Sequence, residues 1–520
     1  MKSHVMRVID LFDRGARLYP RNLAFVDDNR SLTYQESADI THHIATRLRS
    51  TPGIDKGSHV AIYSPNAADA FLCLLGTYRA EMVYVPLNPR FSLENNINIM
   101  RQFDVDFLFY NSRFENIIRQ IRVGSPRIRG FVCINERGDA GPYLNDWLEG
   151  YRQKFEPDFP DPEAIAAISA TGGTTGKPKG VVRTQRAFAI GILDSHAFWQ
   201  TDVGTRNLLA TPMAHAGGIL SMNHFPKGGT NYLLQGADLV RIMAMIQEKR
   251  ITHLFLPPTA IYMMLAHPDV KKYDYSSLIR FIIAGGPLAP NKFKEAIEVF
   301  GPAMCNDYGQ SEANSMVCCL TSEHYLNLDG SINEKRLRTI GIPTLAHRVE
   351  IMDDNGNILG PGEPGEMVLR GPCRMTEYYK DPEVTREATR FGWLHTGDIG
   401  IKDEEGFFSI IDRKKDMIIS GGYNVFPSEV EEVILQFPNI EGCAVIGVPD
   451  EKWGEAVNAV IKLTPNGRVN IEELIAHCKE RVSIKAPKRV VIWDNLPLSP
   501  LGKVLRREVR SRFLSKDHTG

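Results

Sequence analysis

Thr171-Gly-Gly-Thr-Thr-Gly-Lys-Pro-Lys-Gly180 is a stretch made of glycines, hydroxyl side chains and two lysines. Glycine lets backbone N–H groups close around phosphate oxygens, threonine hydroxyls add donors, and lysine supplies positive charge. A Walker A loop places Ser or Thr directly after its lysine to hold magnesium, whereas Pro178 follows Lys177 here. The stretch therefore predicts a polyphosphate-binding loop that is not a P-loop. The competing interpretation is an ordinary turn, in which the same residue types are common.

Four further motifs follow this loop in order along the chain. They are Asn306-Asp-Tyr-Gly-Gln-Ser-Glu312, Gly392-Trp-Leu-His-Thr-Gly-Asp398, Asp412-Arg-Lys-Lys-Asp416 and Leu501-Gly-Lys503. Taken together, in this order and at this spacing, the five motifs resemble the adenylate-forming superfamily. That superfamily includes acyl- and aryl-CoA synthetases, firefly luciferases and the adenylation domains of nonribosomal peptide synthetases. The resemblance extends from about Leu11 to Arg510.

Length and composition limit the classes of protein to consider. The chain has 520 residues, 43% of them hydrophobic and 24% charged, with a formal net charge of −1. This length predicts at least two domains, and the balanced charge gives no general attraction to nucleic acid or to an anionic membrane. The eight cysteines form no CxxC pair, and no run approaches about 18 apolar residues. We therefore expect a protein of the reduced cytoplasm, without a transmembrane segment or a nucleic-acid partner.

Apolar runs alternate with amphipathic stretches in the first part of the chain. Residues 60–63 and 82–85 are apolar runs on either side of a helical segment around residues 67–78. This βαβ pattern predicts a parallel sheet covered by helices. Residues 254–256 and 281–283 have the character of buried strands that end close to Pro or Gly. Because ligands bind at the carboxyl ends of strands in α/β sheets, we expect the site at these ends.

The character of the sequence changes after about residue 335. Gly/Pro turns, such as residues 353–357 and 360–365, separate short strand-like runs and predict a small β-rich subdomain. After Arg413 a compact segment begins, with a helix that starts near Pro427. We predict an α/β protein with an N-terminal adenylate-forming domain over residues 1–411 and a small mobile α+β domain over residues 412–520. The first domain would contain two βαβ-type sheets and the β-rich subdomain of about residues 335–411.

The resemblance implies that the protein activates a carboxylic acid. A carboxylate is a poor electrophile because it has no usable leaving group, and joining it to AMP makes a mixed anhydride that a thiol can attack. The implied cofactors are ATP, Mg²⁺ and CoA, and pyrophosphate leaves when ATP is cleaved between its α and β phosphates. Negative charge gathers around the α-phosphorus in the transition state, so cations and N–H donors are the main catalytic requirement.

The resemblance also implies roles for individual residues. Lys503 would stabilise the transition state of adenylation, Glu312 would bind Mg²⁺, and His215 would gate or line the acyl pocket. These three residues form the predicted catalytic set. The same resemblance implies the ATP-binding residues, grouped by the part of the nucleotide they would contact. The phosphates would be bound by Thr171, Gly172, Gly173, Thr174, Thr175, Gly176, Lys179 and Ser311, the adenine would be surrounded by Gly285, Gly286, Pro287, Asn306 and Tyr308, and the ribose hydroxyls would be bound by Asp398 and Arg413.

Thioester formation is implied to need a rotation of the small C-terminal domain. Lys415 holds the hinge position of the family. Gly421 and Gly422 would line a narrow tunnel for pantetheine, because glycine permits close backbone approach. Residues 479–512 contain ten Lys/Arg and three Asp/Glu, which makes Lys488 and Arg489 candidates for binding the CoA phosphates. The alternative for these two residues is an ordinary solvated face.

The acid itself is predicted from the size of the residues around the expected pocket. No Asp follows His215 to pair with a substrate ammonium, so an amino acid is disfavoured. Two alternatives to an acyl-CoA synthetase stay open, namely an enzyme that loads the phosphopantetheine of an acyl carrier protein, and a nucleotide-binding relative without activity. The intact site motifs argue against the second. We predict a fatty or aryl acid, because the pocket residues are all small and leave room for an extended or bulky apolar group: Ala216, Gly217, Gly218, Ala284 and Gly309.

Overall fold

The computed structural model describes residues 6–157, 160–171, 178–313, 316–498 and 504–517. The chain divides into two compact units. The large unit consists of Met1–Arg348 and Arg370–Leu394, and the small unit consists of Val349–Leu369 and His395–Gly520.

The first sheet of the large unit has seven strands. In spatial order they are β18 (Glu377–Tyr378), β8 (Lys179–Thr184), β7 (Ile165–Thr171), β4 (Val83–Pro86), β3 (His59–Tyr63), β5 (Phe107–Tyr110) and β6 (Gly130–Cys133). Neighbours from β7 to β6 are parallel, whereas β8 is antiparallel to both β7 and β18. Strand β5 reads Phe-Leu-Phe-Tyr and is buried throughout, as expected for a parallel strand covered on both faces.

The second sheet of the large unit has nine strands. In spatial order they are β15 (Ile342–Pro343), β14 (Cys318–Leu320), β13 (Met304–Tyr308), β12 (Arg280–Ile283), β11 (His253–Leu256), β9 (Arg206–Leu209), β10 (Thr230–Leu233), β1 (Leu23–Val26) and β2 (Ser31–Thr33). Neighbours from β13 to β1 are parallel, and β14, β15 and β2 add antiparallel edges. The carboxyl ends of the parallel strands therefore meet at one edge of the sheet.

The helices of the large unit begin at recognisable signals. Thr33 and Glu36 form a capping box at the start of the second helix, and Asp238 caps the ninth. The α-helices are α1 (Val8–Leu18), α2 (Tyr34–Arg49), α3 (Ala68–Arg79), α4 (Leu93–Gln102), α5 (Glu115–Gly124), α6 (Leu144–Trp147), α7 (Gln185–Trp199), α8 (Ala216–Met222), α9 (Leu239–Glu248), α10 (Pro258–Leu265), α11 (Pro290–Phe300), α12 (Ser322–Tyr325) and α13 (Pro382–Ala388).

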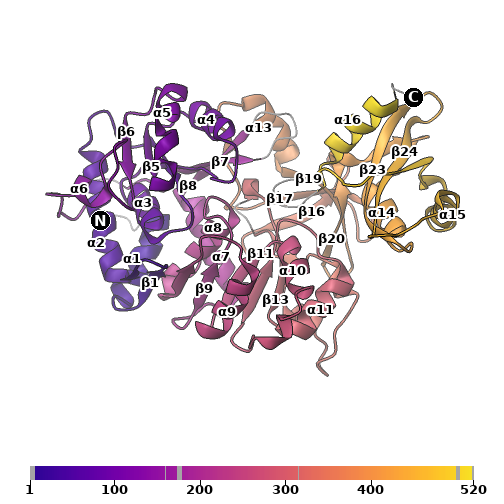
Figure 1. Cartoon of the computed structure of the whole chain (residues 1–520), viewed down its shortest axis with the longest axis horizontal. Helices are drawn as coiled ribbons and strands as arrows, with labels where there is room; N and C mark the ends of the chain where they lie inside the picture. Colours follow the sequence, from indigo (N-terminus) through magenta and orange to yellow (C-terminus); the bar gives the residue numbers. More distant parts are fainter. Residues whose placement is uncertain (1–5, 158–159, 172–177, 314–315, 499–503, 518–520) are drawn as a thin grey trace. The chain divides into compact units, whose positions relative to one another are not determined.

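Side chains of β3 alternate between two apolar cores. Val60 and Ile62 belong to a core that contains residues of α1, α2 and α3, three helices that pack on one another (Figure 1). Ala61 and Tyr63 belong to a second core with residues of α4 and α5. The first core also contains Phe25 from β1, so helices and side chains from both sheets share it.

In the part of the small unit that the structure describes, there are two sheets and three α-helices. The first sheet is β16 (Arg348–Met352), β17 (Gly365–Arg370), β19 (Leu394–Lys402) and β20 (Phe408–Arg413). The second is β22 (Tyr423–Val425), β21 (Ile418–Ser420), β24 (Gly454–Leu463) and β23 (Ile440–Asp450), with β25 (Arg489–Ile492) beside β24. The helices are α14 (Pro427–Leu435), α15 (Ile471–Val482) and α16 (Arg506–Asp517).

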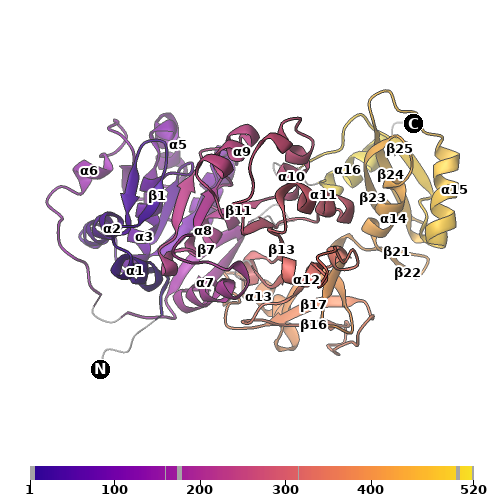
Figure 2. The same cartoon turned by 90° about the horizontal axis from the view of Figure 1, so that it is seen from below.

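Strand β23 places its alternate side chains against different helices. Cys443 and Val445 share a core with residues of α14 and α15, whereas Ala444 and Ile446 share one with Val509 of α16. Figure 2 shows these helices around β23 and β24. Alternate side chains of a strand point to opposite faces of the sheet. Because helices cover both faces of β23, the strand needs apolar residues at almost every position.

The predicted α/β class is confirmed, with parallel sheets in the N-terminal part and a smaller antiparallel region in the C-terminal part. The β-rich strands β16, β17, β19 and β20 group with the residues that follow them in the small unit. The domain boundary at residues 411 and 412 stays a prediction. Within the described ranges, none of the helices has the length and apolar character needed to cross a bilayer.

Candidate active site

Neighbouring strands of the second sheet hold the residues predicted to surround adenine. Asn306 on β13 pairs in register with Ile283, the last residue of β12. Gly285 follows with a φ of 86°, a left-handed conformation that glycine adopts without strain. The structure therefore brings residues 284–287 and 306–308 to the same edge of the sheet. Their contact with adenine stays a prediction.

A β-hairpin holds the two ends of the predicted phosphate loop. Thr171, the last residue of β7, pairs with Lys179, the first residue of β8. The Thr171 hydroxyl donates a hydrogen bond to the Lys179 carbonyl oxygen at 3.4 Å. Residues 172–176 and Lys503 lie outside the described residues, so their roles also stay predictions.

Glu312 lies in a short 3-10 turn, Ser311–Ala313, which packs against β8. Tyr378 of β18 donates its hydroxyl to Oε1 of Glu312 at 2.9 Å. The ammonium of Lys179 lies 5.0 Å from the centroid of the same tyrosine ring. Sequence reasoning missed Tyr378, because 66 residues separate it from Glu312 and no local pattern marks it. One side chain therefore joins a predicted phosphate-binding lysine to the predicted metal-binding carboxylate.

His215 precedes α8 and is held by Asn88. The side-chain nitrogen of Asn88 lies 2.7 Å from His215 Nε2, and its side-chain oxygen accepts the backbone N–H of Arg90 at 2.9 Å. Because the oxygen is used in this way, the Asn88 amide donates to Nε2, and the ring proton of neutral His215 lies on Nδ1. Burial, together with the charge of Arg90, lowers the pKa of His215. The imidazole is therefore neutral at pH 7.

A cavity of about 180 Å³ opens beside Asn88. Arg90 and Arg113 are among its lining residues, and among the described residues no carboxylate forms an ion pair with either. Such a cavity suits an anionic group. The lining residues are Ser64, Pro65, Asn66, Asn88, Pro89, Arg90, Arg113, Phe114, Ala210, Pro212, Ala214, Gln235 and Gly236.

Two glycines of the predicted acyl pocket have a packing role. A Cβ at Gly217 would lie 2.2 Å from the Thr211 hydroxyl oxygen, and a Cβ at Gly218 would lie 2.0 Å from the Met213 carbonyl oxygen. Both glycines are buried and let α8 approach the chain that precedes it. Whether they line the acyl pocket with Ala216, Ala284 and Gly309 stays a prediction.

Asp398 and Arg413, the predicted ribose ligands, face each other across β19 and β20 in the small unit. Arg413 Nε lies 2.6 Å from Asp398 Oδ1, and Asp398 is 3% exposed. The ion pair holds the carboxylate in one orientation. The structure therefore brings together two residues that the motifs place 15 positions apart.

The predicted hinge residue Lys415 lies in a short 3-10 turn, Lys414–Asp416, directly after β20. Lys414 Nζ lies 3.0 Å from Glu366 Oε2. Burial alone would raise the pKa of Glu366, but hydrogen bonds from His395 and Lys414 lower it to about 2. The residue before Lys415 is thereby anchored to β17.

Gly421 and Gly422 form the turn between β21 and β22, with φ values of 59° and 83°. The backbone N–H of Gly421 donates to the Trp453 carbonyl oxygen at 2.8 Å. The Lys488 ammonium lies 5.0 Å from the centroid of the Trp453 ring. The structure thus brings two of the predicted CoA elements together through a tryptophan that sequence reasoning missed. Arg489 instead stacks over Phe513 of α16.

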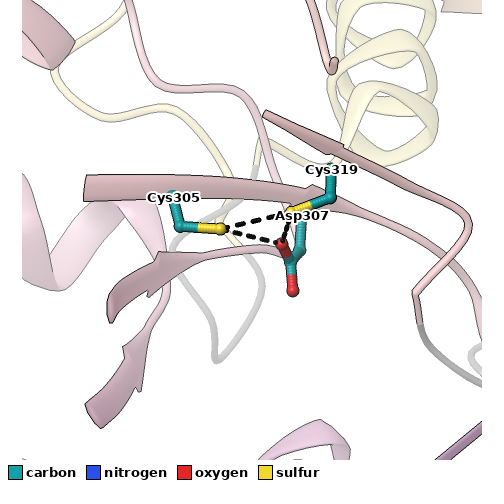
Figure 3. A group of neighbouring side chains, drawn as sticks. All are labelled: Cys305, Asp307 and Cys319. Atoms are coloured by element: carbon teal, nitrogen blue, oxygen red, sulfur yellow. Dashed lines mark hydrogen bonds between the residues drawn. The ribbon is translucent and has the colours of Figure 1, made fainter. Parts of the chain in front are cut away.

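Three buried side chains, Cys305, Asp307 and Cys319, form a cluster that includes one residue of the 306–312 motif (Figure 3). Because alternate residues of a strand point to opposite faces, Cys305 and Asp307 lie on the face of β13 opposite to that of Asn306 and Tyr308. Asp307 Oδ1 accepts hydrogen bonds from Cys305 at 3.2 Å and from Cys319 of β14 at 3.0 Å, and the two sulfur atoms are 3.3 Å apart.

The chemistry of this cluster favours a structural role over a metal site. Burial raises the pKa of Asp307 to about 6, and apolar side chains enclose the two cysteines. A closed structural zinc site uses four ligands, whereas the described residues supply three, and both thiols already donate to Asp307. We interpret the cluster as a hydrogen-bonded support for the strand that carries Asn306 and Tyr308.

Comparison with known proteins agrees with the motifs. Residues 12–379 match the family model described as AMP-binding enzyme, and residues 429–503 match the AMP-binding enzyme C-terminal domain. The medium/long-chain-fatty-acid–CoA ligase FadD8 of Mycobacterium tuberculosis is 40% identical over 507 residues, which cover 94% of this chain and 87% of that protein. A feruloyl-CoA synthase of an Amycolatopsis species is 32% identical over 506 residues, which cover 96% of this chain and 98% of that protein.

The fold is also found among solved structures. The amide bond synthetase McbA from Marinactinospora thermotolerans has a TM-score of 0.86 and 27% identity, covering 97% of this chain and 100% of that one. Because the first family model matches well over half of the chain, and both relatives align along nearly its whole length, the chain belongs to the AMP-binding enzyme family.

Proposed function

We propose that this protein is an acyl-CoA synthetase that activates a hydrophobic carboxylic acid, fatty or aryl, with ATP. The observation that carries the proposal is the meeting of Lys179 and Glu312 at Tyr378, with the Glu312 turn packed against β8 directly after the 306–308 segment, on a chain of this family. Relatives that act on medium- or long-chain fatty acids and on ferulate support the choice of acid.

The reaction has two steps. In the first, an oxygen of the acid attacks the α-phosphorus of ATP, the bond from that phosphorus to the bridging oxygen breaks, and pyrophosphate leaves. In the second, the thiol of CoA attacks the acyl carbon and AMP leaves with the bond electrons, while the thiol proton passes to solvent. Lys503 would stabilise charge only in the first step.

The residues present fit a magnesium ion. Glu312 offers a half-buried carboxylate, and Oε1 accepts a neutral hydroxyl. Carboxylates and phosphates are the ligands that Mg²⁺ uses in nucleotide sites. Bound there, Mg²⁺ would neutralise phosphate charge, and Glu312 would hold it. The protein's own part is to orient Glu312 and Lys179, which both contact Tyr378.

His215 would act on the acyl side without transferring a proton. Its neutral ring accepts from Asn88, so Nε2 is already occupied. The cavity with Arg90 and Arg113 would accept the phosphate groups of CoA, because guanidinium groups bind phosphate in a bidentate manner. Lys488 beside Trp453 is a second candidate for this contact, in the small unit.

A panel of carboxylic acids tests the proposal. We expect pyrophosphate release that depends on a fatty or aryl acid, and an acyl-CoA product only when CoA is present. The alternative acceptor, the phosphopantetheine of an acyl carrier protein, predicts adenylate without acyl-CoA and turnover restored by the holo-carrier. Absence of pyrophosphate release with every acid in the panel would contradict an adenylating enzyme of either kind.

A further inference from the structure

Tyr378 contacts two residues of the proposed phosphate and metal site, although no motif contains it. Its hydroxyl lies 2.9 Å from Glu312 Oε1, and its ring centroid lies 5.0 Å from Lys179 Nζ. The side chain is buried, with 7% of the residue exposed. Hydrogen bonds to charged groups and cation–π contacts are stronger where water is excluded.

The ring of Tyr378 is itself held in place. Tyr378 pairs in register with Val181 of β8, and its backbone N–H donates to the Thr385 hydroxyl of α13 at 2.9 Å. The next residue, Tyr379, donates its backbone N–H to the Gly180 carbonyl oxygen at 2.7 Å. The strand that begins with Lys179 therefore also fixes the tyrosine that contacts Glu312.

Two contacts from one segment hold Glu312. The hydroxyl of Tyr378 donates to Glu312 Oε1 at 2.9 Å. The backbone N–H of Met375 also donates to the Glu312 carbonyl oxygen at 2.6 Å. Residues 375–378 thus hold both the main chain and the side chain of Glu312.

We propose that Tyr378 is a positioning residue, which sets the Glu312 carboxylate and the Lys179 ammonium in the relative orientation that Mg²⁺ and the phosphates of ATP require. The proposal rests on the proposed function, in which Glu312 holds Mg²⁺ and Lys179 binds phosphate. Tyr378 acts through these two side chains and touches neither the reacting carboxylate nor the α-phosphorus.

The neighbouring tyrosine provides a matched control. Tyr379 also donates its hydroxyl to a carboxylate, Asp104 Oδ2, at 2.7 Å. Tyr378→Phe and Tyr379→Phe therefore each remove one hydroxyl that binds a carboxylate, and both keep the ring. The Lys179 contact survives in Tyr378→Phe, because it depends on the ring alone.

The experiment measures ATP binding by calorimetry at a series of Mg²⁺ concentrations, without acid, so that no turnover occurs. We expect Tyr378→Phe to raise the Mg²⁺ concentration at half-saturation about tenfold or more, the usual effect of losing a hydrogen bond to a charged group. Tyr379→Phe should leave it unchanged. Pyrophosphate release with acid at saturating Mg²⁺ should stay within about threefold of wild type in Tyr379→Phe, and the melting temperatures of the two variants should agree.

Equal shifts in the two variants, or lower turnover with an unchanged Mg²⁺ half-saturation in Tyr378→Phe, would overturn the positioning role. Glu312→Gln separates this outcome from a failure of the proposed function. If Glu312→Gln weakens Mg²⁺-dependent binding and Tyr378→Phe does not, only the role of Tyr378 is wrong. If Glu312→Gln leaves the Mg²⁺ dependence unchanged, the metal role of Glu312 is wrong and the inference falls with it.

Discussion

Gly218 tests whether α8 is a pocket wall or a tightly packed support. An alanine Cβ at this position would lie 2.0 Å from the carbonyl oxygen of Met213 and 2.8 Å from its carbonyl carbon. The oxygen belongs to the backbone and cannot rotate away, so α8 or the 213 segment must move by about 1 Å. Overpacking of this severity lowers the free energy of unfolding by about 3 kcal/mol. The better helix propensity of alanine offsets about 1 kcal/mol of that loss. Gly218→Ala should therefore be about 2 kcal/mol less stable.

The expected result is a uniform loss of activity. Because α8 starts directly after His215, a shift of the helix displaces that side chain, and kcat/KM should fall about tenfold or more for acids of every chain length. The melting temperature, measured by differential scanning fluorimetry, should fall with it. Gly442→Ala is the control, because its Cβ would meet its nearest neighbour, Leu496 Cδ1, at an ordinary 3.5 Å.

A selective loss of the longer acids, with the melting temperature unchanged, would refute this reasoning. It would show that Gly218 borders open space in the acyl pocket, as the sequence suggested, and that the contact with Met213 relaxes at little cost.

Three further outcomes follow from the proposed function and from burial. Lys503→Ala should abolish acyl-adenylate formation, on the order of 10²-fold or more, yet spare thioester formation from supplied acyl-AMP; adenylation at the wild-type rate would remove Lys503 from the catalytic set. Lys415→Pro should leave adenylation near normal and block the thioester step, because proline holds φ near about −65°; equal loss in separate assays of the two half-reactions would remove Lys415 as the hinge. Lowering the pH from 7 to 5 should destabilise the fold: burial lowers the pKa of His253 to about 4, so protons bind the unfolded chain first, and this histidine alone loses about 2 kcal/mol of stability between pH 7 and pH 5. Because burial also lowers the pKa of His42, His196 and His224, His253→Gln should reduce the pH dependence in urea unfolding without abolishing it, and an unchanged slope would contradict the role of His253.

Several elements were predictable because their signals are local. The helix expected around residues 67–78 is α3, and the flanking apolar runs are β3 and β4. The helix expected after Pro427 is α14. In each case a short apolar run or a helix-starting proline is enough, since backbone preference and burial act over a few residues.

The positions of single site residues depended on more than local signals. The small size of Gly217 and Gly218 predicts an acyl pocket, and this stays a prediction, while the structure shows that each glycine also faces an atom of the preceding chain at close range. The sequence alone does not distinguish a glycine that leaves room for a ligand from one that leaves room for another part of the protein. The tertiary structure distinguishes these two roles, because it shows which atoms lie next to the glycine.

The sequence by itself determined the family, the α/β class and the chemistry of activating a carboxylic acid, because the motifs carry their residue types in a fixed order. The tertiary structure decided which side chains meet: Tyr378 with Glu312, Asn88 with His215, and Cys319 with Asp307. The first two pairs are 66 and 127 residues apart. Their contact follows from the order and register of strands and from packing between distant segments, and no local pattern in the chain encodes that proximity.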